Sequence, residues 1–315
     1  MKKVTITELT RESATDLGKQ SYFASARQRG DVLNHGFRYE MLKAVKLFPR
    51  ATRLVAYQSE EKTAIGFLYL EENTDWLYTI EYVFVDQKYR KMGLATNLIN
   101  YALMLARELG AKKVNLNVAS SSTKAIELYK KLGFRKIGQT FLVQGSLLGS
   151  APLRLVKRTF MGQGCLTKLA LERKGLLFEL ETNSRKNRET LFGIYQRSMN
   201  QEWINFFEIT PCNLINGSRH IWQPPFFKDV LINELENSFA LIFNLPFSSK
   251  ATVELYGSSD SVVLSVLEDL LKILAKRGIS FTQIALFNPI NNAFSSFFEE
   301  KGMMTYEFVA MGQTL

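Results

Sequence analysis

The chain has 315 residues, of which 46% are hydrophobic, including 23 Phe and 12 Tyr. This length predicts about two domains, and the apolar content excludes a disordered chain. The net charge of +10 is uneven: residues 1–160 carry 26 Lys and Arg against 14 Asp and Glu, and residues 161–315 carry 14 against 16. The first half is therefore expected to meet an anion, either a nucleic acid or a phosphate-bearing cofactor, unless it simply has a basic surface.

The sequence disfavours a membrane or secreted protein, a metal site and a histidine-based catalytic triad. No apolar run approaches the ~20 residues of a bilayer span, and no apolar stretch follows the lysines of MKKVTITELT, as a secretory signal would require. We therefore expect a cytoplasmic protein that does not bind membranes. Cys165 and Cys212 match no metal or disulfide spacing, and His35 and His220 are isolated. We expect no metal site and no histidine-based triad.

The first half alternates strand-like and helix-like segments. Periodicity and turn residues predict, in chain order, a strand at 4–9, helices within 11–48, strands at 53–58, 64–70 and 76–85, a helix at 93–109, a strand at 113–118, a helix at 123–132, and paired strands at 134–138 and 153–160 around a Gly/Ser-rich loop at 144–151. This order predicts a mixed sheet flanked by helices in an α/β fold. Residues 161–164 are a candidate linker.

A short basic loop joins strand 76–85 to helix 93–109. It reads Arg90-Lys91-Met92-Gly93-Leu94-Ala95-Thr96. Free N–H groups at a helix N-terminus bind anions, and the helix dipole favours negative charge there. Gly93 and Ala95 would let a pyrophosphate approach the backbone, and Arg90 and Lys91 add positive charge. The loop therefore predicts a pyrophosphate site.

Two segments carry a family resemblance. Arg-x-x-Gly-x-Ala after a strand ending in Val resembles the pyrophosphate loop of the GNAT superfamily of acyl-CoA-dependent N-acyltransferases. Further on, Ala125-x-x-x-Tyr129-x-x-x-Gly133-Phe134 resembles the second cofactor segment of that family. Where the family usually has Asn, this chain has Ser122, which has a shorter reach. The resemblance covers residues 1–160 in order of elements and implies a sheet that splays beside strand 76–85.

The resemblance implies roles for individual residues. Acetyl-CoA would be the co-substrate, and the backbone of Phe84 and Val85 would bind its pantetheine arm like an added strand. Tyr129 would protonate the leaving thiolate, or would only pack its helix onto the sheet. Glu81, expected to share a face with Val83 and Val85, would take the amine proton directly or through water. Its alternatives are a surface carboxylate and a site that uses ordered water alone.

The second half repeats the order of elements in a weaker form. Strands are predicted at 239–243, 252–256, 281–287 and 305–311, and helices at 262–275 and 291–301. We interpret 1–160 as a catalytic domain and 161–315 as a degenerate second copy of the fold. Gly257-Ser258-Ser259-Asp260 stands where the basic loop should be, and Phe298 stands where the first half has Tyr129. The second domain is therefore predicted neither to bind CoA nor to catalyse.

These observations predict an N-acetyltransferase that moves an acetyl group from acetyl-CoA to a primary amine of a small molecule or peptide, by direct transfer through a ternary complex. The alternative is a non-catalytic acyl-CoA sensor or scaffold. Nucleic-acid binding ranks below both, because no recognition helix or aromatic-studded basic strand is present. The protein is expected to be a monomer or a homodimer.

Overall fold

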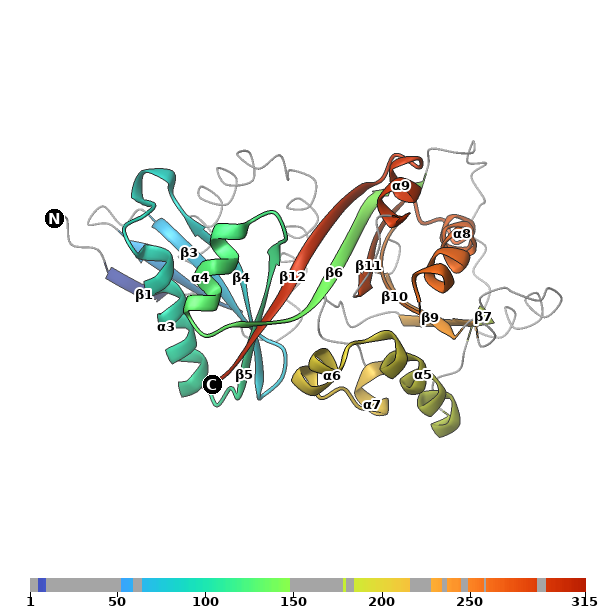
Figure 1. Cartoon of the computed structure of the whole chain (residues 1–315), viewed down its shortest axis with the longest axis horizontal. Helices are drawn as coiled ribbons and strands as arrows, with labels where there is room; N and C mark the ends of the chain where they lie inside the picture. The colour runs from blue at the N-terminus through green and yellow to red at the C-terminus, as the bar shows by residue number, and fades with distance from the viewer. Residues whose placement is uncertain are drawn as a thin grey trace. The chain divides into compact units, whose positions relative to one another are not determined.

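The computed structural model describes residues 5–9, 52–58, 64–147, 178–179, 184–215, 228–233, 237–244, 249–257, 259–287 and 293–315. Their arrangement is mixed α/β, with a large sheet flanked by helices (Figure 1), which confirms the expected fold class. The chain forms two compact units. Unit 1 comprises Met1–Val118, Ser122–Lys136 and Met311–Leu315, and unit 2 comprises Ala119–Ser121 and Ile137–Ala310. The predicted helices within 11–48, the strand at 153–160 and the linker lie outside the described residues.

Unit 1 is built on a sheet whose first four strands are antiparallel neighbours. These are β1 (Thr5–Leu9), β2 (Thr52–Gln58), β3 (Ala64–Glu72) and β4 (Leu77–Val85). β5 (Lys113–Ala119) is parallel to β4, and the helix α3 (Leu94–Glu108) makes the crossover that a parallel pair requires. α3 packs on β2, β3 and β4. The core between helix and sheet is aliphatic and includes Leu68, Leu70, Ile80, Leu98, Ile99 and Leu116.

The last strand of the chain contributes to unit 1. β12 (Met304–Thr314) follows β5 in the strand order, and its end, Met311–Leu315, belongs to unit 1. The N–H of Leu315 donates to the carbonyl of Lys112 at 2.9 Å, so the C-terminus lies beside the start of β5 (Figure 1). This differs from the expected division at residue 160, because each compact unit contains residues from both halves of the sequence.

Unit 2 contains the strands at the other end of the strand order. β7 (Phe178–Glu179), β8 (Lys228–Asn233), β9 (Ser238–Asn244) and β10 (Lys250–Gly257) are antiparallel neighbours. β11 (Phe281–Phe287) is parallel to β10 through the crossover helix α8 (Asp260–Lys276), and α9 (Ala293–Glu299) follows β11. The sequence of strand, helix, parallel strand and helix therefore occurs in both units.

The strand β6 (Arg135–Ser146) is longer than expected. Its residues from Thr140 to Ser146 pair antiparallel with β11, from Phe287 to Phe281. The prediction of a loop from residue 144 is therefore wrong over 144–146. Gly145 and Ser146 are loop-like residues locally, but a partner far along the sequence holds them in the sheet.

The two faces of the unit 2 sheet differ in composition. One face packs aliphatic side chains of β10 against α8 and α9. The other carries a stack of three rings, in which Tyr256 lies 4.7 Å from Phe239 and 5.0 Å from Phe287 between ring centroids. Tyr195 and Trp203 pack on this stack from α5 (Arg185–Ser198) and α6 (Gln201–Phe207). The short helix α7 (Pro211–Ile215) follows.

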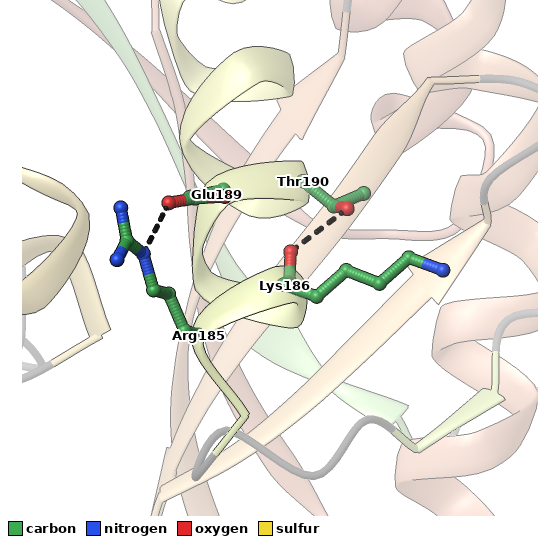
Figure 2. Close-up of polar contacts among 4 residues, drawn as sticks. All are labelled: Arg185, Lys186, Glu189 and Thr190. Atoms are coloured by element: carbon green, nitrogen blue, oxygen red, sulfur yellow. Dashed lines mark hydrogen bonds and ion pairs between the residues drawn. The ribbon is translucent and has the colours of Figure 1, made fainter.

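Surface contacts on α5 are of the ordinary helical kind. Arg185 Nε donates to Glu189 Oε1 at 2.8 Å, and Thr190 Oγ1 donates to the carbonyl of Lys186 at 3.1 Å (Figure 2). Both bonds join residues four apart, and the charged side chains are exposed. Exposed contacts of this kind add little to the stability of a helix, so α5 depends on its buried residues Leu191, Ile194 and Tyr195.

Among the described residues, no helix combines the length and apolarity needed to cross a membrane. In the same part of the chain, no three His, Cys, Asp or Glu residues gather where they could hold a metal ion. Cys212 is exposed and is not in a disulfide.

Candidate functional site

The basic loop ends at the start of α3, where Gly93 is the N-cap residue. Gly93 has φ of +78° and makes no side-chain cap, and Lys91 is also left-handed, with φ of +66°. The first helical bond runs from the N–H of Asn97 to the carbonyl of Gly93 at 3.0 Å. The N–H groups of Leu94, Ala95 and Thr96 precede it and have no acceptor inside the helix. The residues present therefore fit a pyrophosphate.

The space in front of this helix end is open. A Cβ added to Gly93 would meet no atom within 4 Å among the described residues. Arg90, Lys91 and Met92 are exposed, and Met92 keeps 62% of its surface accessible. Within the part of the chain that the structure describes, a charged ligand can therefore approach the loop from the side of Gly93.

Arg90 is anchored to the strand that precedes the loop. Its Nε donates to the carbonyl of Val85 at 3.0 Å, which leaves the two terminal guanidinium nitrogens directed elsewhere. Between Val85 and Arg90 the chain forms the 3₁₀ turn η2 (Gln87–Tyr89). Asp86 closes this turn, because its Oδ1 accepts the N–H of Lys88 at 2.9 Å. The loop therefore has a defined shape that holds Arg90 between the end of β4 and the start of α3.

The strands β4 and β5 separate before they end. Their parallel pairing runs from Leu77 and Lys113 to Ile80 and Leu116. β4 continues to Val85 without a further partner in β5, within the part of the chain that the structure describes. The edge of β4 after Ile80 is therefore open, as the splayed sheet of the prediction requires.

Backbone direction distinguishes the two residues that were expected to bind pantetheine. The N–H of Asp86 donates to Ile65 of β3 at 2.8 Å, and Phe84 pairs with Phe67 of β3. Because backbone groups alternate along an antiparallel strand, those of Phe84 point to β3 and those of Val85 point to the open edge. Only Val85 is thus oriented for an added strand, and its carbonyl already accepts Arg90.

A bulge in β4 changes which side chains share a face. β3 pairs Tyr69 with Glu81 and Phe67 with Phe84, so three steps along β4 match two along β3. Glu81 therefore shares a face with Phe84, whose ring centroid lies 5.3 Å from that of Phe67. The prediction that Glu81 shares a face with Val85 is wrong, because the extra residue shifts the alternation.

The position of Gly66 shows which face this is. A Cβ on Gly66 would lie 3.3 Å from both Leu98 of α3 and Val85, so Val85 is on the α3 side of the sheet. Glu81 is on the opposite side, half-buried. The side chain of Thr79, two residues earlier on that face, donates to Asn115 Oδ1 at 2.8 Å and accepts from Asn73 Nδ2. This buried polar cluster holds β4 and β5 together just before they separate.

Tyr129 lies in α4 (Thr123–Lys131), is only 8% exposed, and is fixed by the turn that follows. Its carbonyl accepts the N–H of Phe134 at 3.0 Å, and the carbonyl of Lys130 accepts that of Gly133 at 3.0 Å. With Gly133 at φ of +93°, this is a Schellman motif. The rings of Tyr129 and Phe134 meet edge to face at 6.0 Å. Burial raises the pKa of Tyr129 to about 12, so the phenol keeps its proton at neutral pH.

Ser122 is the N-cap of α4. Its carbonyl accepts the N–H groups of Ala125 and Ile126, but its exposed hydroxyl makes no capping bond. The hydroxyl also has no hydrogen-bond partner among the described residues. It therefore remains available to a ligand, within the short reach of a serine.

The corresponding part of unit 2 is closed. β10 and β11 pair continuously from Lys250 and Phe281 to Leu255 and Leu286, so they do not splay. Ser259 caps α8 by accepting the N–H of Val262 at 3.4 Å. A Cβ on Gly257 would lie 2.6 Å from Val263 Cγ2, and Phe298 is fully buried in the core. The open strand edge and the uncovered helix start of unit 1 are both missing from the described part of unit 2.

The described site residues thus form two groups in unit 1. The stretch from Phe84 to Thr96 is continuous along the end of β4, the loop and α3, with Glu81 on the preceding part of β4. Tyr129 and Ser122 lie at opposite ends of α4. Sequence reasoning missed Phe134 as the ring that fixes Tyr129, and it missed the polar cluster at Thr79. The period-2 alternation of β4 places Thr79 on the same face as Glu81, and this signal could have predicted the polar cluster.

Comparison with known sequences agrees with this geometry. Residues 19–134 match the model of the acetyltransferase (GNAT) family. The chain is 32% identical over 112 residues to the peptidyl-lysine N-acetyltransferase YjaB of Salmonella typhimurium, which covers 35% of this chain and 69% of that protein. It is 33% identical over 88 residues to human N-acetyltransferase 8, covering 27% of this chain. The chain spans only 39% of the length of that human relative.

Solved structures resemble the chain over its full length. A GCN5-related N-acetyltransferase from Sphaerobacter thermophilus aligns with a TM-score of 0.58 at 14% identity, covering 99% of this chain and 95% of that one. A tandem GNAT protein from the clavulanic acid biosynthesis pathway aligns with a TM-score of 0.50 at 11% identity, covering 99% and 98%. These likenesses concern the fold. Taken with the sequence matches and the open loop at Gly93, they show that the chain belongs to the GNAT family of acetyltransferases.

Proposed function

We propose that the protein transfers an acetyl group from acetyl-CoA to a primary amine of a small molecule or peptide, by direct transfer in a ternary complex. The observation that carries this proposal is the start of α3, where the N–H groups of Leu94 to Thr96 have no acceptor in the helix and the preceding loop carries Arg90 and Lys91. A diphosphate matches this site in charge and in its need for hydrogen-bond donors.

The rest of unit 1 supports the binding of the pantetheine arm. An arm with amide groups needs backbone partners, and the edge of β4 after Ile80 has no partner in β5. Val85 presents its backbone on that edge, and Ser122 offers a hydroxyl at the start of α4. Lys91, Met92 and Gly93 form the exposed wall of the loop.

The acetyl group is supplied as a thioester, in which the C–S bond breaks as the C–N bond to the amine forms. In our proposal Tyr129 donates its proton to the departing thiolate, since burial keeps the phenol protonated. Glu81 accepts the proton of the attacking amine, directly or through water. N–H groups of the open part of β4 donate to the oxyanion that develops on the carbonyl.

The second unit is proposed to be a degenerate copy that supports the first. Phe298 has no proton to donate at the position of Tyr129, Ser259 caps α8, and β10 and β11 pair continuously, so the features proposed for catalysis in unit 1 are not repeated here. Asp260 adds a negative charge at the start of α8, where the equivalent position in unit 1 follows a basic loop.

The test is release of free CoA thiol from acetyl-CoA with a panel of primary amines, lysine peptides and aminosugars. The wild-type protein is expected to turn over at least one class, and Tyr129→Phe is expected to lower kcat about 10²-fold while changing acetyl-CoA affinity little. If the protein binds acetyl-CoA but no acceptor causes the release of free CoA thiol, the proposal of an acetyltransferase is contradicted. Such a result would favour a sensor.

A further inference from the structure

The last strand of the chain reaches the helix that carries Tyr129. The end of β12 belongs to unit 1, where Leu315 bonds to Lys112 beside β5. In the same segment, Gln313 lies over the turn that closes α4. A Cβ on Gly133 would be 2.9 Å from Gln313 Nε2 and 3.4 Å from its Cδ. The side-chain amide of Gln313 therefore occupies the space above Gly133.

That turn determines how Tyr129 is held. Gly133 must adopt its left-handed conformation for Phe134 to reach back and donate to the carbonyl of Tyr129. The same reach places the Phe134 ring against the Tyr129 ring. A side chain packed on Gly133 limits the movement of this turn, and hence of the phenol.

The contact has the character of packing rather than of a hydrogen bond. Gln313 Oε1 is buried and has no hydrogen-bond partner among the described residues. A buried amide oxygen without a partner is unfavourable, so this oxygen does not stabilise the site. What Gln313 contributes is the volume of its side chain over Gly133.

We propose that Gln313 is a positioning residue for acetyl transfer: it holds the Gly133 turn and, through Phe134, the orientation of Tyr129. This inference rests on the proposed role of Tyr129 as proton donor. On this proposal β12 takes part in acetyl transfer, although β12 is far along the sequence from the loop proposed to bind acetyl-CoA.

The experiment compares three variants on β12. Gln313→Ala removes the volume, Gln313→Met keeps it without the amide, and Thr314→Ala changes the exposed neighbour on the same strand. Misplacement of a catalytic group by ~1 Å can cost about 100-fold in rate, so for a smaller shift we expect Gln313→Ala to lower kcat about tenfold. The KM for acetyl-CoA should change little. Gln313→Met and Thr314→Ala should keep the parental kcat.

A double variant separates positioning from general damage. If Gln313 acts through Tyr129, adding Gln313→Ala to Tyr129→Phe should cause no further loss of kcat. An equal loss in both backgrounds overturns the positioning role and leaves the proposed function standing, as does an unchanged kcat in Gln313→Ala. A Tyr129→Phe variant as fast as the parent removes Tyr129 from the proposed mechanism and overturns the positioning role with it.

The inference also has a readout that needs no acceptor. Loosening the turn should admit water to Tyr129 and lower its pKa from about 12 toward the ordinary value. The phenolate absorbance of Tyr129, obtained by difference from Tyr129→Phe, should then appear at lower pH in Gln313→Ala but not in Gln313→Met. Identical titrations in the two variants would overturn the role of side-chain volume.

Discussion

At the scale of single residues, Gly93 combines two requirements of an anion site. Its φ of +78° is a conformation that residues other than Gly rarely adopt, and its missing Cβ leaves the front of α3 open. Asn and Asp tolerate the left-handed region better than other side chains. A pair of variants at this position can therefore test charge with the backbone unchanged.

We predict that Gly93→Asp weakens acetyl-CoA binding at least about tenfold more than Gly93→Asn, a difference of ~1.4 kcal/mol. Both side chains have the same shape, but only the carboxylate repels a diphosphate. Calorimetric titration of each variant measures the difference, and thermal unfolding checks that both remain folded. Equal affinities would contradict the assignment of the loop to the pyrophosphate.

Tyr129 gives a second residue-scale prediction, which concerns pH. Its pKa is raised by burial to about 12, so the folded protein favours the neutral phenol. This contribution to stability is complete below the unfolded pKa of ~10 and is lost as the pH rises toward about 12. Near pH ~10, where ordinary tyrosines are half ionised, the wild type and Tyr129→Phe should have the same phenolate absorbance. If the wild type instead had more phenolate absorbance than Tyr129→Phe, by the amount of half a tyrosine, Tyr129 would not be buried as the structure shows.

At the scale of elements, the polar cluster under the opening of the sheet joins three segments. Thr79 of β4 bonds to Asn115 of β5 and to Asn73 in the turn before β4. All three side chains are buried, whereas Asn117, two residues further along β5, is exposed. The two asparagines of β5 thus form a matched pair for mutation.

We predict that Asn115→Ala lowers the free energy of unfolding by about 1–3 kcal/mol, because it leaves buried polar partners unsatisfied. The control Asn117→Ala should stay within ~0.5 kcal/mol of the parent. Urea denaturation followed by fluorescence measures the difference, with Trp203 and Trp222 replaced by Phe in both variants and in the parent so that Trp76 alone gives the signal. Similar stability of the two variants would show that the cluster does not hold the strands together.

How well the elements could be predicted depended on where their signals lie in the sequence. β11 and α3 agree with prediction because apolar periodicity and a following glycine are local features. The bulge in β4 left no local mark, and so the face of Glu81 was predicted wrongly. The extension of β6 and the place of β12 beside β5 depend on partners far along the chain, which periodicity cannot reveal. The loop at Gly93 was recognisable because its chemistry lies in consecutive residues.

At the scale of the whole molecule, the same order of strand, helix, parallel strand and helix occurs in both units. Both units have a helix between parallel strands, but only in unit 1 do those strands separate early. We predict that one acetyl-CoA binds per chain. Calorimetry should give this stoichiometry, and Gly93→Asp should weaken this one binding event without revealing a second. If an acetyl-CoA molecule still bound to unit 2 in that variant, the prediction of one binding site per chain would be wrong.

The arrangement of the C-terminus makes a final prediction about the molecule as a whole. Met311–Leu315 follow unit 2 in sequence but belong to unit 1, where Leu315 bonds to Lys112 and Gln313 covers Gly133. A chain that ends at Ala310 loses the end of β12 beside the start of β5 and the packing of Gln313 over Gly133. It should therefore lose acetyl transfer, even though every residue of the loop from Arg90 to Thr96 is intact.

Hydrogen exchange can locate the damage from this truncation. Local opening has its own free energy in each cooperative region of a protein, so amides of β5 and α4 should exchange faster while those of β10 and β11 in unit 2 stay protected. Thr314→Ala in the full-length chain is the control and should exchange like the parent. Unchanged protection of β5 in the truncated chain would mean that unit 1 is complete without its last strand. Faster exchange throughout both units would mean instead that the segment stabilises the molecule generally rather than unit 1.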